Sequence, residues 1–274
     1  GGELIMFDFY NQMNAINSTY ELINNQFKNL QKFNTVGYKA EVKTFTEIYN
    51  DNVGTGAVKT ETKTLFTQGN VKKTGGKNHL AIQGNGLFVV SDGEKNYYTR
   101  RGDFELKDGK LVCPEGNLVV KAFKVDESGK RTDKLVDVDL SIDKNGLILG
   151  KYNDYQIDDN GVINGILRYT DPVTNQTITK KEPIYKIALA NFSDPSILTR
   201  KSDTVFDAKD IKPVLGEAGT GAFGEIKAQH LEMSNINIPE QVQQAMLAQM
   251  QYNATMSSFR ALNDMVKNAS QLVR

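Results

Sequence analysis

The sequence FYNQMNAINSTYELINNQFKNL, at residues 9–30, decides the fold of the N-terminal end of the chain. Its apolar residues follow one another in steps of four and three, which places them along one stripe of an α-helix. Neither glycine nor proline occurs in residues 3–36, and Gly37 is a natural stop because glycine accepts the left-handed conformation that closes helices. The sequence therefore predicts a long helix whose stripe consists of Phe9, Met13, Ile16, Tyr20, Ile23, Phe27 and Leu30.

Residues 236–274, at the C-terminal end, predict a second long helix of the same kind. Its start is marked by Asn237, which can cap free N–H groups, by Pro239 in the first turn, and by Glu240 at the position of a capping box. Apolar residues also occur on other faces of this helix, so it must be covered on more than one side. The main heptad stripe contains Ile238, Val242, Ala245, Tyr252, Met256, Phe259, Val266 and Val273.

The chain between these helices consists of short β-like runs separated by glycine turns. The spacing of the runs, about 8–12 residues, favours an antiparallel sandwich or barrel over alternating β and α units. We expect a mainly β fold with long terminal helices, divided into residues 1–36, 37–235 and 236–274, the β-rich body having two possible subdomains, 37–80 plus 200–235 and 81–199. The expected strands lie at 87–90, 97–99, 104–106, 110–112, 118–125, 136–142, 147–149 and 185–192.

The charge of the chain is balanced and unevenly distributed. Lysine plus arginine equals aspartate plus glutamate at 33 each, so there is no overall basic field to attract nucleic acid. The two ends are poor in charge, whereas the middle is rich in it. No apolar run approaches the length of a membrane span, and Leu4–Phe7 follows Glu3 rather than a basic stretch. A secretory signal is therefore not expected, and by this argument alone the compartment is the cytoplasm.

Few residues offer chemistry for catalysis or metal binding. Gly219–Gly224 matches the G-x-G-x-x-G string of dinucleotide-binding folds, which leaves a nucleotide-binding enzyme as one alternative hypothesis. A strand-like run follows this loop, however, where such a fold needs a helix. His79 and His230 have no neighbouring His or Cys at ligand spacing, and Cys113 is expected to be buried rather than reactive. We expect no enzymatic activity, no cofactor and no metal ion.

The two charge-poor helices indicate self-association. Two such helices packed only on each other would leave much apolar surface in water, and that surface needs partners. We therefore expect an assembly interface formed by the seven residues of the N-terminal stripe and, on the C-terminal helix, by Val242, Ala245, Tyr252, Met256, Phe259, Val266 and Val273. A β-rich adhesin or binding module with a helical stalk is another alternative, which predicts a small oligomer of fixed size.

Several short blocks of sequence resemble the bacterial flagellar rod and hook protein family. Asn34-Thr35-Val36-Gly37-Tyr38-Lys39 is similar to the family signature that follows the N-terminal helix. The blocks at 66–71, 80–90 and 98–104 resemble the next three, and 231–237 resembles the block that opens the C-terminal helix. The residues that carry the resemblance are Asn34, Thr35, Gly37, Tyr38, Lys39, Gly84, Gly86, Phe88, Gly102, Phe104, Leu231, Glu232, Ser234 and Asn235.

This resemblance implies an axial structural protein whose terminal helices line the core of a helical tube and whose β domains form the outer shell. It implies self-assembly, contact with other rod and hook proteins, and export through the flagellar secretion apparatus without a cleaved signal, to an extracytoplasmic place in the basal body. The length of 274 residues favours a rod subunit, with a hook subunit lacking large outer domains as the alternative. Residues 24–33 depart from the family pattern, which suggests a minor rod component.

Overall fold

The computed structural model describes residues 2–50, 53–126, 130–172 and 175–272, which form two compact units. The first, here called the helical unit, comprises Gly1–Phe33, Ala40–Leu65 and Ile236–Arg274. The second, the β body, comprises Asn34–Lys39 and Phe66–Asn235. Residues 40–65 thus cluster with the helices. The predicted division into assembly segments 1–36 and 236–274 and a β-rich body 37–235 stays a prediction.

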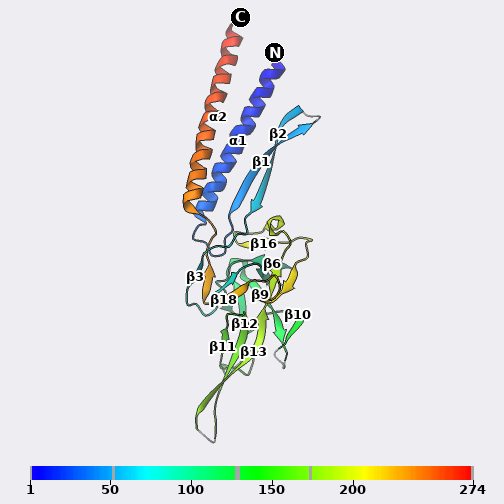
Figure 1. The fold of residues 1–274 in the computed structure, drawn as a ribbon, viewed down its shortest axis with the longest axis vertical. Helices are drawn as coiled ribbons and strands as arrows, with labels where there is room; N and C mark the ends of the chain where they lie inside the picture. Colours follow the sequence, from blue (N-terminus) through cyan, green and yellow to red (C-terminus); the bar gives the residue numbers. More distant parts are fainter. Residues whose placement is uncertain (1, 51–52, 127–129, 173–174, 273–274) are drawn as a thin grey trace. The chain divides into compact units, whose positions relative to one another are not determined.

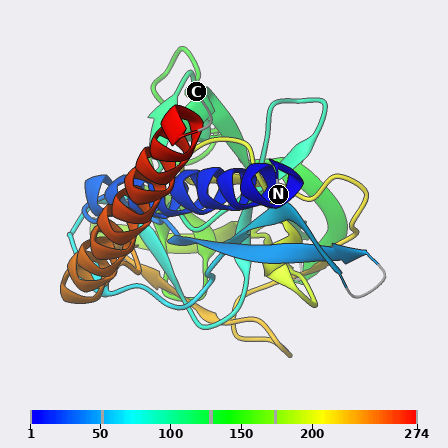
Figure 2. The ribbon, with the colours of Figure 1, turned by 90° about the horizontal axis from the view of Figure 1, so that it is seen from above.

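The helical unit is built on two antiparallel helices, α1 (Gly2–Gln31) and α2 (Ile238–Leu272) (Figure 1). Near one end the rings of Phe9 and Phe259 meet edge to face, with centroids 5.0 Å apart. Near the other, Asn29 donates a hydrogen bond to Gln241, with 3.0 Å between Nδ2 and Oε1. Seen from above, the two helices cross at an angle (Figure 2). The predicted helices are therefore both present.

The first helix ends before the predicted stop. It closes at Gln31, where the amide of Lys32 donates to the carbonyl of Asn29 in a tightened last turn. Gly37 does take the left-handed conformation, with a φ of 69°. However, its amide donates to the carbonyl of Glu232, 2.8 Å away, so Gly37 serves the β body rather than the helix end.

A long hairpin of β1 (Glu41–Asn50) and β2 (Val53–Thr64) lies beside α1 in the same unit (Figure 1). Asn29, which is 1% exposed, joins the hairpin to the helix. Its Nδ2 donates to the carbonyl of Glu41 at 2.8 Å, and its Oδ1 accepts from the Glu41 amide at 3.1 Å. The Lys28–Glu41 ion pair, 2.8 Å long, adds a second contact at the same place.

The buried side chain of Asn25 lowers the stability of the helical unit. Its side chain is 3% exposed, and neither its nitrogen nor its oxygen has a hydrogen-bond partner within the described part of the chain. A buried polar group without a partner costs about 1–3 kcal/mol. We expect Asn25→Leu to raise the free energy of unfolding of the helical unit by a similar amount, measured by thermal melting of helical circular dichroism. Asn24→Leu, at an exposed position, is the matched control and should give no such gain; destabilisation by Asn25→Leu would contradict this account.

The β body is dominated by one antiparallel sheet of 13 described strands. The main path runs β11-β12-β13-β9-β5-β6-β16-β15, with β7, β8, β10, β14 and β17 attached at its sides, while β18 pairs with β4 and β19 with β3. The strands are β3 (Val71–Lys73), β4 (Leu80–Gln83), β5 (Leu87–Ser91), β6 (Asn96–Thr99), β7 (Glu105–Lys107), β8 (Lys110–Cys113), β9 (Leu118–Val125), β10 (Arg131–Asp137), β11 (Asp154–Ile157), β12 (Val162–Thr170), β13 (Thr177–Ile187), β14 (Leu189–Asn191), β15 (Thr199–Arg200), β16 (Val205–Asp207), β17 (Val214–Gly216), β18 (Glu225–Ala228) and β19 (His230–Glu232), with short 3-10 turns at Glu115–Asn117 and Pro195–Ile197.

The sheet is buried on both faces around its central strand, β5. Phe88 and Val90 point into one apolar cluster, and Leu87 and Val89 point into another on the opposite face. Successive side chains of a strand point to opposite faces, so a strand covered on both sides reads as a continuous apolar run. The predicted class, mainly antiparallel β with a helix at each end of the chain, is confirmed.

Three predicted strands differ from the structure. Residues 147–149 contain only two isolated bridges, both at Ile148, because Leu149 and Gly150 both have positive φ and turn the chain away from pairing. The run at 185–192 is two strands, since β13 pairs with β9 up to Ile187 and β14 then pairs with β5 and β17. Of the run at 136–142, only the first two residues are in a strand, because β10 ends at Asp137.

Candidate functional site

The predicted stripe of α1 divides into an inner and an outer half. Phe9, Ile16 and Leu30 are half-buried and Ile23 is buried, which is what packing within the chain requires. The other members, Met13, Tyr20 and Phe27, are 52%, 55% and 53% exposed. A heptad pattern alone does not separate these two roles, because both sets repeat every seven residues.

The second helix shows a similar division. Ala245, Tyr252, Met256, Phe259 and Val266 of the predicted stripe are half-buried, whereas Ile238 and Val242 are exposed and Val273 lies outside the described residues. Large exposed side chains lie elsewhere on α2, at Met246, Leu247, Met250 and Met265. We call Met13, Tyr20 and Phe27, together with these four residues, the outer helix face.

The β body brings together blocks that lie far apart in the sequence around one buried ion cluster. Lys39 Nζ lies 2.6 Å from Glu232 Oε1, and Arg100 Nη1 lies 3.1 Å from Glu232 Oε2. The side chains of Lys39 and Glu232 are fully buried, and that of Arg100 is 5% exposed. Removing charges from water costs several kcal/mol each unless they are paired and hydrogen-bonded, so these three groups depend on one another.

Backbone groups complete the cluster. The amide of Gly69 donates to Glu232 Oε1 at 2.8 Å, and Lys39 Nζ also donates to the carbonyl of Thr67 at 2.6 Å. Arg100 Nη2 donates to the carbonyl of Gly84 at 2.7 Å. Burial lowers the pKa of Lys39 to about 8, because desolvation of the ammonium group outweighs the attraction of Glu232. Repulsion by the charge of Arg100 lowers this pKa further.

Two motif glycines allow the backbones to approach around this cluster. A Cβ on Gly37 would collide with the backbone of Arg101, and a Cβ on Gly102 would collide with the carbonyl of Leu80. The Gly102 carbonyl in turn accepts a hydrogen bond from the Leu80 amide, 2.9 Å away. Only glycine lacks the atom that would prevent these contacts.

The remaining motif residues surround the same region of the β body. Tyr38 is fully buried beneath the guanidinium of Arg200, 4.7 Å from the ring centroid, and Asn235 Nδ2 donates to Thr67 Oγ1 at 2.8 Å. Phe88 and Phe104 meet edge to face in the core. Leu231 and Ser234 are buried, Gly84 and Gly86 have positive φ, Thr35 is half-buried and Asn34 is exposed.

The loop Gly219–Gly224 does not have the geometry of a dinucleotide site. It connects β17 to β18, so a strand follows it where a phosphate-binding loop needs the N-terminus of a helix. A Cβ on Gly224 would collide with the carbonyl of Gln83, and the ring of Phe223 covers Gly216. Close packing therefore accounts for Gly224, whereas Gly219 and Gly221 have positive φ values of 72° and 58° and open space where a Cβ would lie.

The two histidines bond locally. His79 Nδ1 lies 2.8 Å from Thr74 Oγ1, and His230 Nδ1 lies 2.7 Å from the carbonyl of Ala228. In the described ranges, no group of three or more His, Cys, Asp or Glu side chains is placed to hold a metal ion. The same part of the chain has no helix of the length and apolarity that a bilayer crossing requires.

Cys113 provides a reporter for opening of the β body. The residue is fully buried, and burial raises the pKa of its thiol to about 12. We expect the folded protein to resist a thiol reagent at pH 8 and to react after unfolding, measured by mass spectrometry with the denatured protein as control. Between the ordinary pKa of about 9 and the folded value, the folded state holds a proton that the unfolded state has lost, so this contribution to stability falls as pH rises. Rapid labelling of the folded protein would contradict the assigned burial.

Comparison with known proteins agrees with the resemblance. Residues 81–165 match the flagellar hook protein FlgE/F/G D1 domain. The flagellar basal-body rod protein FlgG of Buchnera aphidicola subsp. Baizongia pistaciae is 25% identical over 224 residues, 80% of this chain and 74% of the relative. FlgG of Borreliella burgdorferi is 24% identical over 273 residues, 96% of this chain and 91% of the relative. The hook protein FlgE of the same organism is 28% identical over 134 residues, 48% of this chain and 28% of the relative.

These matches, with the mainly β fold and its two terminal helices, define a class: structural proteins of the bacterial flagellar axis. Within that class, the chain is similar to proteins of the flagellar rod and hook family. The family expected from the sequence blocks is confirmed, and its proteins are located in the flagellar basal body and hook.

Proposed function

We propose that this chain is a rod subunit that assembles into a helical tube through its terminal helices. The observation that carries the proposal is the outer helix face. Met13, Tyr20 and Phe27 on α1, and Met246 and Met250 on α2, each leave more than half of their surface in water. Burial of apolar surface is worth about 25 cal/mol per Å², so contact with other helices would stabilise an assembly.

A rod subunit fits the comparisons better than a hook subunit does. The FlgG matches given above extend over 80–96% of this chain and 74–91% of the relatives. The hook-protein matches extend over only 29–48% of the chain and 18–28% of the relatives. This difference in coverage supports a chain organised like a rod protein over most of its length.

The proposed partners follow from this assignment. The terminal segments 1–36 and 236–274 would form the assembly core with copies of the chain and with other rod and hook proteins, and the β body would make lateral contacts. The flagellar export apparatus would deliver the subunit to its extracytoplasmic place in the basal body without a cleaved signal. The apolar stripes of both helices support the first of these proposals, since each stripe has members that are exposed.

We assign no reaction to the chain. The nucleotide-binding alternative would require tight binding of ATP or NAD that is lost on Gly221→Val, whereas we expect neither nucleotide to bind. Calorimetry with both nucleotides tests this directly.

The proposed function is tested by electron microscopy of the full chain at increasing concentration, combined with sedimentation. We expect tubes or filaments above a critical concentration, as the rod assignment requires. A monomer at every concentration, also in the presence of preformed axial filaments, would contradict the proposal. A small oligomer of fixed size would favour the adhesin-like alternative instead.

A further inference from the structure

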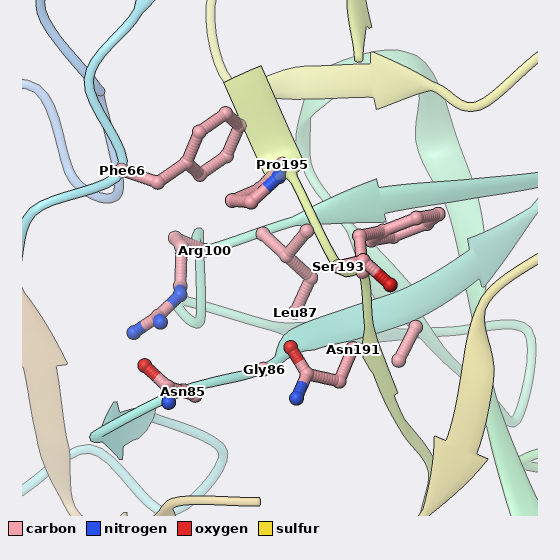
Figure 3. Close-up of a pocket in the computed structure, with 10 residues that line it drawn as sticks. Phe66, Asn85, Gly86, Leu87, Arg100, Asn191, Ser193 and Pro195 are labelled. Carbon is pink, nitrogen blue, oxygen red and sulfur yellow. The ribbon is translucent and has the colours of Figure 1, made fainter. Parts of the chain in front are cut away.

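A pocket of about 370 Å³ opens on the β body next to the buried ion cluster. It lies where β5 begins and β14 ends, so backbone from both strands contributes to its wall. Figure 3 shows Arg100, Asn85 and Asn191 on one side of the pocket and Phe66, Leu87 and Pro195 on the other. The pocket thus combines a cation and two amides with an apolar wall.

The ion cluster beside the pocket carries an uncompensated positive charge. Lys39 and Arg100 are two cations, and both are paired with the single carboxylate of Glu232. Both oxygens of that carboxylate are engaged, because Oε1 accepts from Lys39 and Gly69 and Oε2 accepts from Arg100. An excess positive charge in a poorly solvated region attracts an anion more strongly than the same charge would in water.

Arg100 also retains a free donor. Its two terminal nitrogens bind Glu232 and the carbonyls of Ile82 and Gly84. Its Nε is buried and has no hydrogen-bond partner among the residues that the structure describes. A guanidinium recognises a carboxylate by donating hydrogen bonds to it, and a charge-assisted bond of this kind is about twice as strong as a neutral one.

The neighbouring carboxylate, that of Asp194, binds elsewhere and does not pair with Arg100 Nε. Asp194 follows the pocket residue Ser193, but its carboxylate caps a 3-10 turn by accepting from both the amide and the hydroxyl of Ser196. Arg200 lies over the ring of Tyr38 and donates to the carbonyl of Lys39. The balance of charge around the pocket therefore favours an anion.

We propose that this pocket binds the carboxylate of an acidic side chain from a neighbouring axial subunit, with Arg100 Nε and the amides of Asn85 and Asn191 as donors. The apolar wall of Phe66 and Leu87 suits the hydrocarbon part of a glutamate, and the open mouth admits a side chain carried on another protein. That the acidic side chain belongs to a neighbouring subunit rests on the proposed function. The carboxylate site itself does not.

The carboxylate site is tested on the full chain by NMR, using the Nε–H signal of Arg100 in ¹⁵N-labelled protein. The probe is glutamate capped as an N-acetyl amide, and the control is capped glutamine at the same ionic strength. We expect a saturable shift of the Arg100 signal with capped glutamate and none with capped glutamine. No shift, or equal shifts with both probes, would overturn the site.

A variant pair connects the site to assembly. Asn191→Asp places a competing carboxylate at the pocket, and Asn96→Asp adds the same charge at an exposed position of β6. We expect Asn191→Asp to weaken capped-glutamate binding at least tenfold and to raise the critical concentration for assembly, while Asn96→Asp changes neither. Normal assembly by Asn191→Asp would show that the acidic group does not come from a subunit. If the unaltered chain bound capped glutamate but never assembled, the proposed function would fail and the carboxylate site would stand.

Discussion

Glu232→Gln is expected to lower the free energy of unfolding of the β body by about 3–5 kcal/mol, the cost of leaving buried charges without their partner. Glu232 is the only anion between Lys39 and Arg100 in the cluster described above, and all three side chains are almost completely buried. Glutamine keeps the size of the side chain, so the loss would report charge rather than packing. Lys39→Met is expected to cost less, under about 2 kcal/mol, because Glu232 keeps both Arg100 and the Gly69 amide.

The measurement is urea unfolding followed by labelling of Cys113, which reports the β body and not the helical unit. Glu94→Gln, at an exposed position of the same unit, is the control and should leave the midpoint unchanged. Equal losses for Glu232→Gln and Lys39→Met, or no loss for either, would show that the cluster does not hold the body together in the way its geometry indicates.

Met250→Asp and Tyr20→Asp are expected to weaken assembly strongly without separating α1 from α2. Met250 is 67% and Tyr20 55% exposed, so more than half of each side chain lies outside the packing within the chain. In an assembly, each substitution would remove apolar surface that contacts a neighbouring subunit. It would also place a charge in an interface from which water is excluded. We expect the critical concentration to rise at least about 100-fold, which corresponds to about 2.7 kcal/mol.

Sedimentation at increasing concentration measures this effect, and helical circular dichroism shows that the helices remain. Gln243→Asp, an exposed polar position on α2, is the matched control and should assemble normally. Ile23 and Phe259 are less suitable sites, because Ile23 is buried and Phe259 packs on Phe9 inside the chain. Assembly of both aspartate variants at the usual concentration would exclude the outer helix face as the contact surface.

The terminal helices and the β character of the middle could be predicted from the sequence because their periodicities are local. The heptad from Phe9 to Leu30 and the alternation of apolar runs with glycine turns each depend on residues close in the chain. The hairpin of β1 and β2 was missed, although β-branched residues recur at every second position in Val42, Thr44 and Thr46. Those positions are mostly threonine, so they carry little apolar signal.

The candidate site could be predicted only in part. The family blocks identified Lys39 and Glu232 as important, but no pattern indicates that residues 193 positions apart form one ion pair. Arg100 was missed as a member of the cluster, and its place two residues before Gly102 in a motif block was the available signal. The division of the heptad stripes into inner and outer halves also depends on how the two helices pack, which a single periodicity cannot specify.

Oxidation of methionine by dilute peroxide, read residue by residue by mass spectrometry, tests the assembly of this chain through its helices most directly. Met13, Met246, Met250 and Met265 are more than half exposed in the single chain, so all four should oxidise readily in dilute solution. In the assembled state we predict that Met13, Met246 and Met250 become at least tenfold slower to oxidise, whereas half-buried Met233 in the β body keeps its rate. Oxidation of those three methionines at unchanged rates in an assembled sample would contradict assembly through the outer helix face.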